Sequence, residues 1–194
     1  MSQLEQVKKL REKTGAGVVD VKKALEEAKG NEEKAIEILR KKGQDKALKK
    51  SDREAKEGVV AAYIHSNNKV GSLVKVYCET DFVAKNSEFQ DLAKDIAMHI
   101  TAMDPKFLKP EDVSSDLIKK EKEIWTEQLK KEKKPKDIVN KILEGKEKKF
   151  REEVSLLSQP FVKNPDITIE ELIAEKVGKI GENIQVGEFV RYEL

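Results

Sequence analysis

Residues 58–78 read GVVAAYIHSNNKVGSLVKVYC, and this stretch decides the fold class. Two runs within it, GVVAAYIH and VGSLVKVYC, are rich in β-branched residues and follow a period of two, which predicts two strands. The link SNNK supplies two asparagines, and asparagine tolerates the backbone conformations that a tight hairpin needs. The sequence therefore predicts a β-hairpin here.

Helical and strand patterns follow the hairpin in turn. Apolar residues recur at helical intervals over residues 89–100, after SEFQ at 87–90, which has the spacing of a capping box. Another helical pattern, IEELIAEKVG, begins after Thr168, and NIQVGEFVRYEL closes the sequence as a strand with a bulge at Gly187. Because regular strand–helix–strand units are missing, we predict an α+β fold with a small antiparallel sheet of about three strands.

The residues before the hairpin predict a separate helical domain. Three short patterns, LEQVKKLREKT, VVDVKKALEEAK and EEKAIEILRKK, each carry one apolar stripe and are separated by glycines. Asn31 is placed to cap the third helix. We predict a three-helix domain over 1–50, a charged linker over 51–57, and a core over 58–194.

Two highly charged helical patterns interrupt the predicted core. They cover 116–132 and 137–150 and are separated by KKPK. Proline ends helices, and two helices joined by so short a link lie side by side. The sequence therefore predicts an antiparallel helical hairpin over 115–150.

Composition restricts the function. Of 194 residues, 39 are basic and 37 acidic, so the formal net charge is +2 and no single-signed field favours general nucleic-acid binding. No run approaches the roughly 20 apolar residues that span a bilayer, so we expect a soluble, cytoplasmic protein. One cysteine and two histidines are too few for a zinc site of these residue types, and neither GxxxxGKS/T nor GxGxxG occurs. We expect no cofactor and no metal.

Two other functions stay open from the residues alone. Cys78 with His65 or His99 offers a thiol and a base for a hydrolase, although a small buried side chain is ordinary at the end of a strand. The basic clusters KALKK and LKKEKKPK offer contacts for an RNA-binding scaffold. Both clusters are interleaved with acids and lack stacking aromatics, so solvated helix faces are the favoured interpretation.

The stretch ETDFVAKNSEF, residues 79–89, carries a more specific pattern. Asp81 and Phe82 stand together on the connection between a strand and a helix, where an aromatic side chain and a carboxylate can reach a partner. Chemistry alone nevertheless favours Phe82 in the core and Asp81 as a cap of the loop. His99, at the edge of the next apolar stripe, is by the same reasoning a structural histidine.

Several blocks in this order resemble the translation elongation factor Ts family, the nucleotide exchange factors of elongation factor Tu. The blocks are VKKLREKTGAGVVDVKKALEEAKGNEEKAIEILRKKG, ETDFVAKNSEF, IAMHI, PKFLKPEDV, KFREEVSLLSQPFV and GENI, and together they extend over nearly the whole chain. The resemblance implies a non-enzymatic factor that binds elongation factor Tu in its GDP-bound and nucleotide-free states. It implies no direct contact with nucleic acid.

The resemblance also implies roles for particular positions. The N-terminal domain would be similar to ubiquitin-associated domains and would dock on elongation factor Tu through Arg11, Val18 and Val19. His99 matches the family histidine expected to press near the partner's phosphate-binding loop.

The family's magnesium-displacing loop matches four consecutive residues, Thr80, Asp81, Phe82 and Val83. In that interpretation Phe82 is the wedge that dislodges Mg²⁺ from elongation factor Tu. The helical hairpin would be the family's coiled-coil module.

The length of the core adds a further expectation. Long members of the family carry two tandem core halves, whereas about ten residues here separate Asn86 from Met98. The resemblance to short members with one half-core implies a homodimer.

Overall fold

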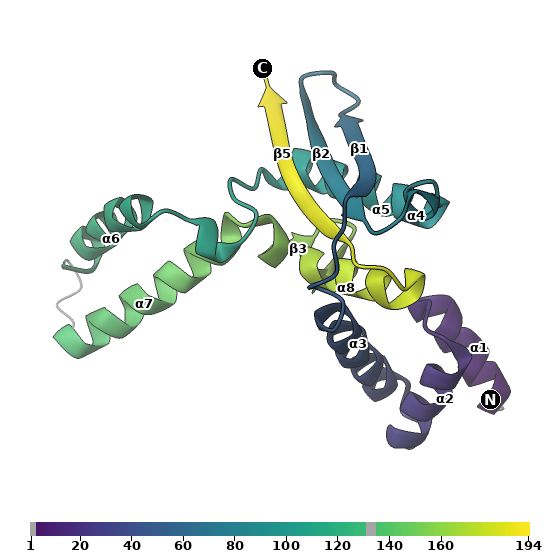
Figure 1. The fold of residues 1–194 in the computed structure, drawn as a ribbon. Helices are drawn as coiled ribbons and strands as arrows, with labels where there is room; N and C mark the ends of the chain where they lie inside the picture. Colours follow the sequence, from purple (N-terminus) through teal and green to yellow (C-terminus); the bar gives the residue numbers. More distant parts are fainter. Residues whose placement is uncertain (1–2, 131–134) are drawn as a thin grey trace. The chain divides into compact units, whose positions relative to one another are not determined.

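The computed structural model describes residues 3–130 and 135–194, and its α+β fold confirms the predicted fold class (Figure 1). The chain forms two compact units: Met1–Met98 with Glu170–Leu194, and His99–Ile169. The domain division expected from the sequence stays a prediction. Over the residues described, no helix is both long and apolar enough to cross a membrane.

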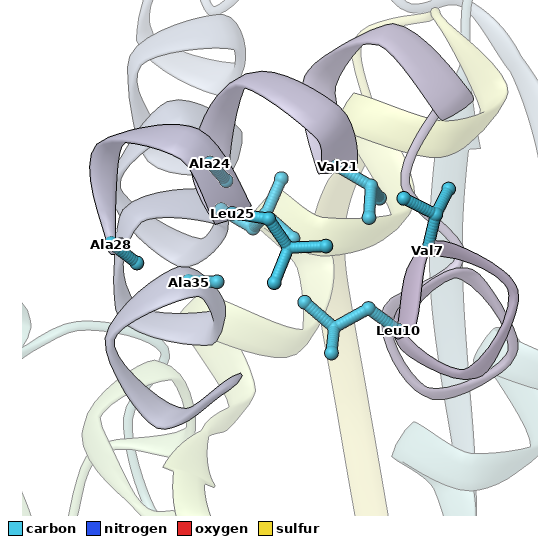
Figure 2. Close-up of a cluster of buried hydrophobic side chains, with 8 residues drawn as sticks. Val7, Leu10, Val21, Ala24, Leu25, Ala28 and Ala35 are labelled. Atoms are coloured by element: carbon cyan, nitrogen blue, oxygen red, sulfur yellow. The ribbon is translucent and has the colours of Figure 1, made fainter. Parts of the chain in front are cut away.

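Three helices begin the chain: α1 (Gln3–Thr14), α2 (Val18–Glu27) and α3 (Glu32–Leu48). Their apolar stripes meet in one buried cluster (Figure 2), as the periodicity predicted. Asn31 caps α3 by accepting a hydrogen bond from the backbone N–H of Lys34 at 3.0 Å. The members of the cluster are Val7, Leu10, Val21, Ala24, Leu25, Ala28, Ala35 and Leu39.

Helix α3 runs further than its sequence pattern and contacts α8 (Ile169–Ile180) within the first unit. A Cβ atom placed on Gly178 of α8 would lie 3.7 Å from the Cα of Gly43 in α3, so two glycines allow the backbones to approach closely. Just beyond α3, the ammonium group of Lys50 donates to the carbonyl of Gly181. These contacts join the three N-terminal helices to the end of α8.

The predicted hairpin is confirmed and forms most of a three-stranded antiparallel sheet in the order β1-β2-β5. Its strands are β1 (Glu57–Ile64), β2 (Val70–Cys78) and β5 (Gln185–Glu193). Asn68 in the turn has φ 55°, the left-handed conformation expected for one of the two asparagines. The bulge expected at Gly187 is present where the β2·β5 register shifts, and the Tyr77 ring occupies the space that a side chain there would need.

One face of the sheet is buried. Val74 and Val76 are 1% and 0% exposed, and the hydroxyl of Ser72 donates to the carbonyl of Ala97 at 2.7 Å. Ala97 belongs to α5 (Ser87–Met103), so this contact connects the sheet to the helix. The capping box expected at 87–90 was wrong: the cap is Asn86, whose side chain accepts from the N–H of Glu88 at 2.8 Å.

The second unit contains α6 (Ser115–Lys130) and α7 (Lys136–Glu153). Arg151, near the end of α7, donates to the carbonyls of Pro110 and Val113 just before α6, so the helices are antiparallel as predicted. Trp125 and Phe150 meet edge to face with ring centroids 5.8 Å apart. The first half of the predicted KKPK link lies outside the described residues.

Short elements complete the fold. No sequence pattern predicted the second sheet, in which β3 (Pro160–Phe161) pairs with β4 (Asn164–Thr168). A strand of two residues has no periodicity to detect. The remaining elements are α4 (Asp81–Ala84) and the 3₁₀ turns η1 (Pro110–Asp112) and η2 (Leu156–Ser158).

We expect Leu10→Ala to lower the free energy of unfolding by about 2–5 kcal/mol, because the side chain is fully buried and its removal leaves a cavity. Leu4→Ala on the same helix is the matched control: Leu4 is 78% exposed, so the loss should stay within about 0.5 kcal/mol. Urea unfolding followed by circular dichroism measures both. Equal losses would show that the three helices do not pack around this cluster.

Candidate functional site

The four residues singled out after the hairpin form a short, capped turn of helix at the end of β2. Thr80 has extended backbone angles, φ −129° and ψ 154°, and its hydroxyl accepts from the N–H of Val83 at 3.3 Å. It is the N-cap of α4. Cys78 before the turn and Ala84 at its end are buried, so both ends of the turn are anchored.

Phe82 projects from this turn into solvent. Its side chain is 82% exposed, which overturns the expectation from chemistry alone that it lies in the core. Leaving a phenylalanine in water forgoes about 1.5–3 kcal/mol of burial. A large aromatic side chain on an anchored turn has the properties of an interface anchor.

Chemistry alone had suggested that Asp81 caps the turn. The cap is Thr80 instead. The Asp81 carboxylate accepts from the ammonium group of Lys85 at 2.7 Å, one helical turn away. This hydrogen bond lowers the pKa of Asp81 and raises that of Lys85. Asp81 is therefore a carboxylate at neutral pH, beside the exposed Phe82.

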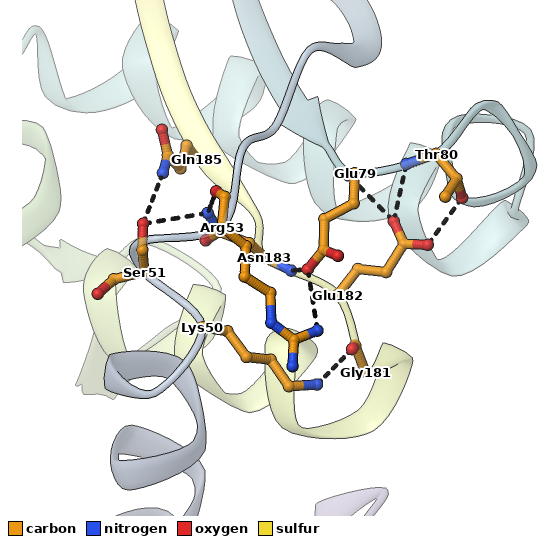
Figure 3. Close-up of polar contacts among 9 residues, drawn as sticks. All are labelled: Lys50, Ser51, Arg53, Glu79, Thr80, Gly181, Glu182, Asn183 and Gln185. Atoms are coloured by element: carbon orange, nitrogen blue, oxygen red, sulfur yellow. Dashed lines mark hydrogen bonds and ion pairs between the residues drawn. The ribbon is translucent and has the colours of Figure 1, made fainter.

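The carboxylate of Glu182 accepts hydrogen bonds from the residues at the N-terminal end of the turn (Figure 3). Its Oε2 accepts from the backbone N–H groups of Glu79 and Thr80 at 3.0 and 3.1 Å. Its Oε1 accepts from the Thr80 hydroxyl at 2.7 Å. One side chain from the segment after α8 thus satisfies three donors at the base of the turn.

A second set of contacts ties the same place to the segment after α3 (Figure 3). The Glu79 carboxylate accepts from the N–H of Asn183 at 2.6 Å and lies 3.6 Å from the Arg53 guanidinium. The Asn183 amide group donates to the carbonyls of Ser51 and Arg53, at 3.3 and 2.7 Å. Sequence reasoning missed the Asn183 hydrogen bonds, because no local pattern predicts pairings between residues 104 to 132 positions apart.

The predicted docking residues lie on the surface of the N-terminal helices. Arg11 is exposed in the last turn of α1, and Val18 and Val19, 40% and 65% exposed, open α2. The short connection at residues 15–17 brings the end of one helix to the start of the next. Two exposed valines beside an arginine suit a protein contact, and the docking role stays a prediction.

His99 is placed differently from the other predicted site residues. Its ring is fully buried in the second unit, where Nδ1 accepts from the N–H of Val162 at 3.2 Å and Nε2 lies 3.0 Å from the Gln159 Oε1. Burial lowers the pKa of His99. This is the environment of a neutral, structural histidine, the alternative that the residues alone favoured. A role against the partner's phosphate-binding loop stays a prediction.

Cys78 has the environment of a structural cysteine. It is fully buried, its Sγ donates to the carbonyl of Thr80 at 3.2 Å, and burial raises its pKa to about 11. His65 follows the far end of β1, about 25 Å from Cys78 along the strand pair. A thiol with so high a pKa, this far from His65, is a poor nucleophile, which argues against a hydrolase built on these two residues.

Acidic groups are not gathered for metal binding in the described parts of the chain. Over residues 3–130 and 135–194, no three His, Cys, Asp or Glu side chains lie close enough together to hold an ion. Glu79 and Glu182 are engaged with donors of the protein itself. The described chemistry is that of a binding surface: an exposed aromatic residue, a carboxylate and a turn that is fixed at its base.

Sequence comparison extends this description. A family model described as Elongation factor TS matches residues 3–194. The chain is 56% identical over 190 residues to elongation factor Ts of Carboxydothermus hydrogenoformans, an alignment that covers 98% of this chain and 88% of that protein. Elongation factor Ts of Thermosipho melanesiensis and of Fervidobacterium nodosum are 53% and 52% identical, over 97% and 98% of this chain and 96% of each relative.

These matches, together with the α+β fold, define a translation elongation factor. The chain belongs to the elongation factor Ts family. The family resemblance inferred from the six sequence blocks is thereby confirmed.

We expect His99 to make stability depend on pH. Its pKa is lowered in the folded protein, so its contribution is complete above the unfolded value of about 6.5 and is lost as the pH falls below it. Between pH 7 and pH 5 one such histidine removes at most about 2 kcal/mol. Urea midpoints at the two pH values measure the loss, which should be smaller in His99→Gln because glutamine does not titrate.

The matched control is His65→Gln, which alters an exposed histidine and should keep the wild-type pH dependence. If His99→Gln and His65→Gln give the same pH profile as the wild type, the buried ring does not govern acid stability.

Proposed function

We propose that this protein is the guanine nucleotide exchange factor of elongation factor Tu. It binds the GDP-loaded partner, displaces the partner's Mg²⁺ with the turn Thr80–Val83, and releases GDP so that GTP can bind. The observation that carries the proposal is Phe82, an 82% exposed aromatic side chain on a turn anchored at both ends, in a chain of the elongation factor Ts family.

The proposed mechanism needs binding and no bond chemistry. Mg²⁺ offsets the charge between nucleotide phosphates and protein carboxylates, so dislodging it exposes their repulsion and weakens nucleotide binding. The side chain of Phe82 supplies the volume that displaces the ion from its site. Asp81, held as a carboxylate beside Lys85, adds to the negative charge that repels the phosphates once the ion has left.

Linkage fixes how the cycle ends. If this protein lowers the affinity of its partner for GDP, bound nucleotide lowers the affinity of the partner for this protein by the same factor. Incoming GTP therefore expels the exchange factor. Arg11, Val18 and Val19 would supply docking energy that is present before and after the ion is displaced.

We further propose that two copies associate through the open face of the sheet. The register places Ile64 and Tyr192 on either side of Gly71, and Leu73 beside Val190, all on the same face. Ile64, Leu73 and Tyr192 are 63%, 45% and 73% exposed and line an apolar hollow there.

A second copy is the occupant that suits this face. Two identical sheet faces related by a twofold axis are self-complementary and can stack about 10 Å apart. The single half-core inferred from the sequence also implies a homodimer. The cytoplasm, where protein synthesis takes place, is the proposed location.

We expect Phe82→Ala to lower the limiting rate of GDP release by about tenfold or more, which corresponds to at least about 1.4 kcal/mol of lost wedge interaction. The assay follows a fluorescent GDP analogue leaving elongation factor Tu in excess unlabelled GDP, over a range of exchange-factor concentrations. Arg11→Ala should instead raise the concentration that gives the half-maximal rate. Leu48→Ala removes a side chain that is similarly exposed, 70%, and should change neither value.

Unimpaired release with Phe82→Ala would remove the wedge assignment. No acceleration by the wild-type protein would overturn the exchange function itself.

The dimer proposal predicts a mass of twice the 22.0 kDa chain by light scattering at micromolar concentration. Leu73→Glu should give the single-chain mass, because it places a charge at the centre of the open sheet face. Leu48→Glu puts the same charge on α3 and should leave the dimer intact. A wild-type protein that runs as a single chain at these concentrations would refute the proposal.

A further inference from the structure

The segment GENI, residues 181–184, has no part in the exchange mechanism described above, although it meets the exchange turn at its base. Gly181 ends α8 with φ 91°, a backbone conformation that suits glycine. Asn183 and Ile184 are buried, 3% and 4% exposed. Glu182, which directly follows Gly181, points to the end of β2 (Figure 3).

We propose that Glu182 is a positioning residue for nucleotide exchange: it fixes the turn Thr80–Val83 so that Phe82 is presented to the partner in one orientation. The proposal rests on the proposed exchange function. Glu182 would not itself touch Mg²⁺ or the nucleotide.

The hydrogen bonds explain how a distant carboxylate can orient the turn. The Thr80 hydroxyl has one proton, which it donates to Glu182 at 2.7 Å. Its lone pairs are then directed away from the carboxylate, and one of them accepts the N–H of Val83. Glu182 therefore selects the hydroxyl orientation in which Thr80 caps α4.

Apart from the burial of Cys78 and Ala84 at its two ends, the turn has little stability of its own. Helix α4 has four residues, and isolated helices of that length are not stable in water. The Asp81–Lys85 pair is exposed and lies within the turn, so it does not tie the turn to the body. The Glu182 bonds to Glu79 and Thr80 do, because they reach across from the segment after α8.

The neighbouring residue extends the connection towards the N-terminal helices. Asn183 donates to the carbonyls of Ser51 and Arg53, directly after α3, while its N–H donates to Glu79. The N-terminal helices, which are proposed to dock on the partner, are thus linked by hydrogen bonds through residues 50–53 to the base of the exchange turn.

The test compares Glu182→Ala with the wild type in two assays. In the exchange assay the limiting rate of GDP release should fall about tenfold or more, while the concentration for the half-maximal rate should change less than about threefold. In hydrogen exchange without partner, the amides of Glu79 and Thr80 should exchange at least about tenfold faster. The amide of Val74, in the middle of the sheet, should keep its wild-type rate.

Three further variants sharpen the test. Glu182→Gln keeps an oxygen for the two backbone donors but lacks the charge, so its limiting rate should lie between the wild type and the alanine variant. Thr80→Val removes the hydroxyl relay, and its effect should not add to that of Glu182→Ala, because both break one chain of hydrogen bonds. Glu54→Ala, which removes an exposed glutamate paired with Lys56, should leave both assays unchanged.

The outcomes separate this proposal from the function on which it rests. A normal limiting rate in Glu182→Ala, with Phe82→Ala impaired, would overturn the positioning role and keep the exchange function. An increased half-maximal concentration with a normal limiting rate would make Glu182 a docking residue and also overturn the proposal. If neither Phe82→Ala nor Glu182→Ala slows GDP release, the wedge assignment and the positioning role both fail. Unchanged hydrogen exchange at the Glu79 and Thr80 amides in Glu182→Ala would by itself refute the anchoring of the turn by Glu182. Should Glu182→Ala not fold, Glu182→Gln decides on the same readouts.

Discussion

The pairing of β2 on both of its edges is the constraint on which the rest of the first unit depends. As the middle strand it is hydrogen-bonded to β1 and to β5, and its inward residues, Val74 and Val76, are almost completely buried. A slip of one residue would turn these valines to solvent and expose Leu73 to the core face instead. The end of β2 is therefore fixed, and so is the point where the chain enters the turn with Phe82.

The contrast between neighbouring residues shows how this fixed point is used. Cys78 is fully buried and Ala84 is 8% exposed, yet Phe82 between them is 82% exposed. The usual tendency to bury a phenylalanine is overridden because the cap at Thr80 and the bonds to Glu182 determine the direction of the turn. A composition-based argument sees a hydrophobic residue near a strand and places it in the core. The exposed position of Phe82 is the one that the role implied by the family resemblance requires, and that role stays a prediction.

Local periodicity was sufficient for much of the fold. The alternating hairpin, the three amphipathic helices, the Asn31 cap and the bulge at Gly187 were all predicted, because each depends on residues close in sequence. The strand β3 was not, since two residues carry no period. The Glu182 contact was missed for a different reason: its donors lie about a hundred residues away, and only the fold brings them together. The candidate site could thus be proposed from the sequence, whereas the groups that support it could not.

The magnitudes show why such support is needed. A wedge displaces an ion only if deforming the wedge costs more free energy than moving the ion. A thousandfold faster release of nucleotide corresponds to about 4 kcal/mol, which sets the load that the wedge must resist. The cap at Thr80 contributes about 0.5–2 kcal/mol, which is too little to resist that load. Hydrogen bonds to a charged group contribute about 1.5–3 kcal/mol each. The lower value is appropriate for the half-buried Glu182, and three such bonds together still exceed the load of about 4 kcal/mol. The proposed wedge role of so short a turn therefore requires the rigidity that the segment after α8 supplies.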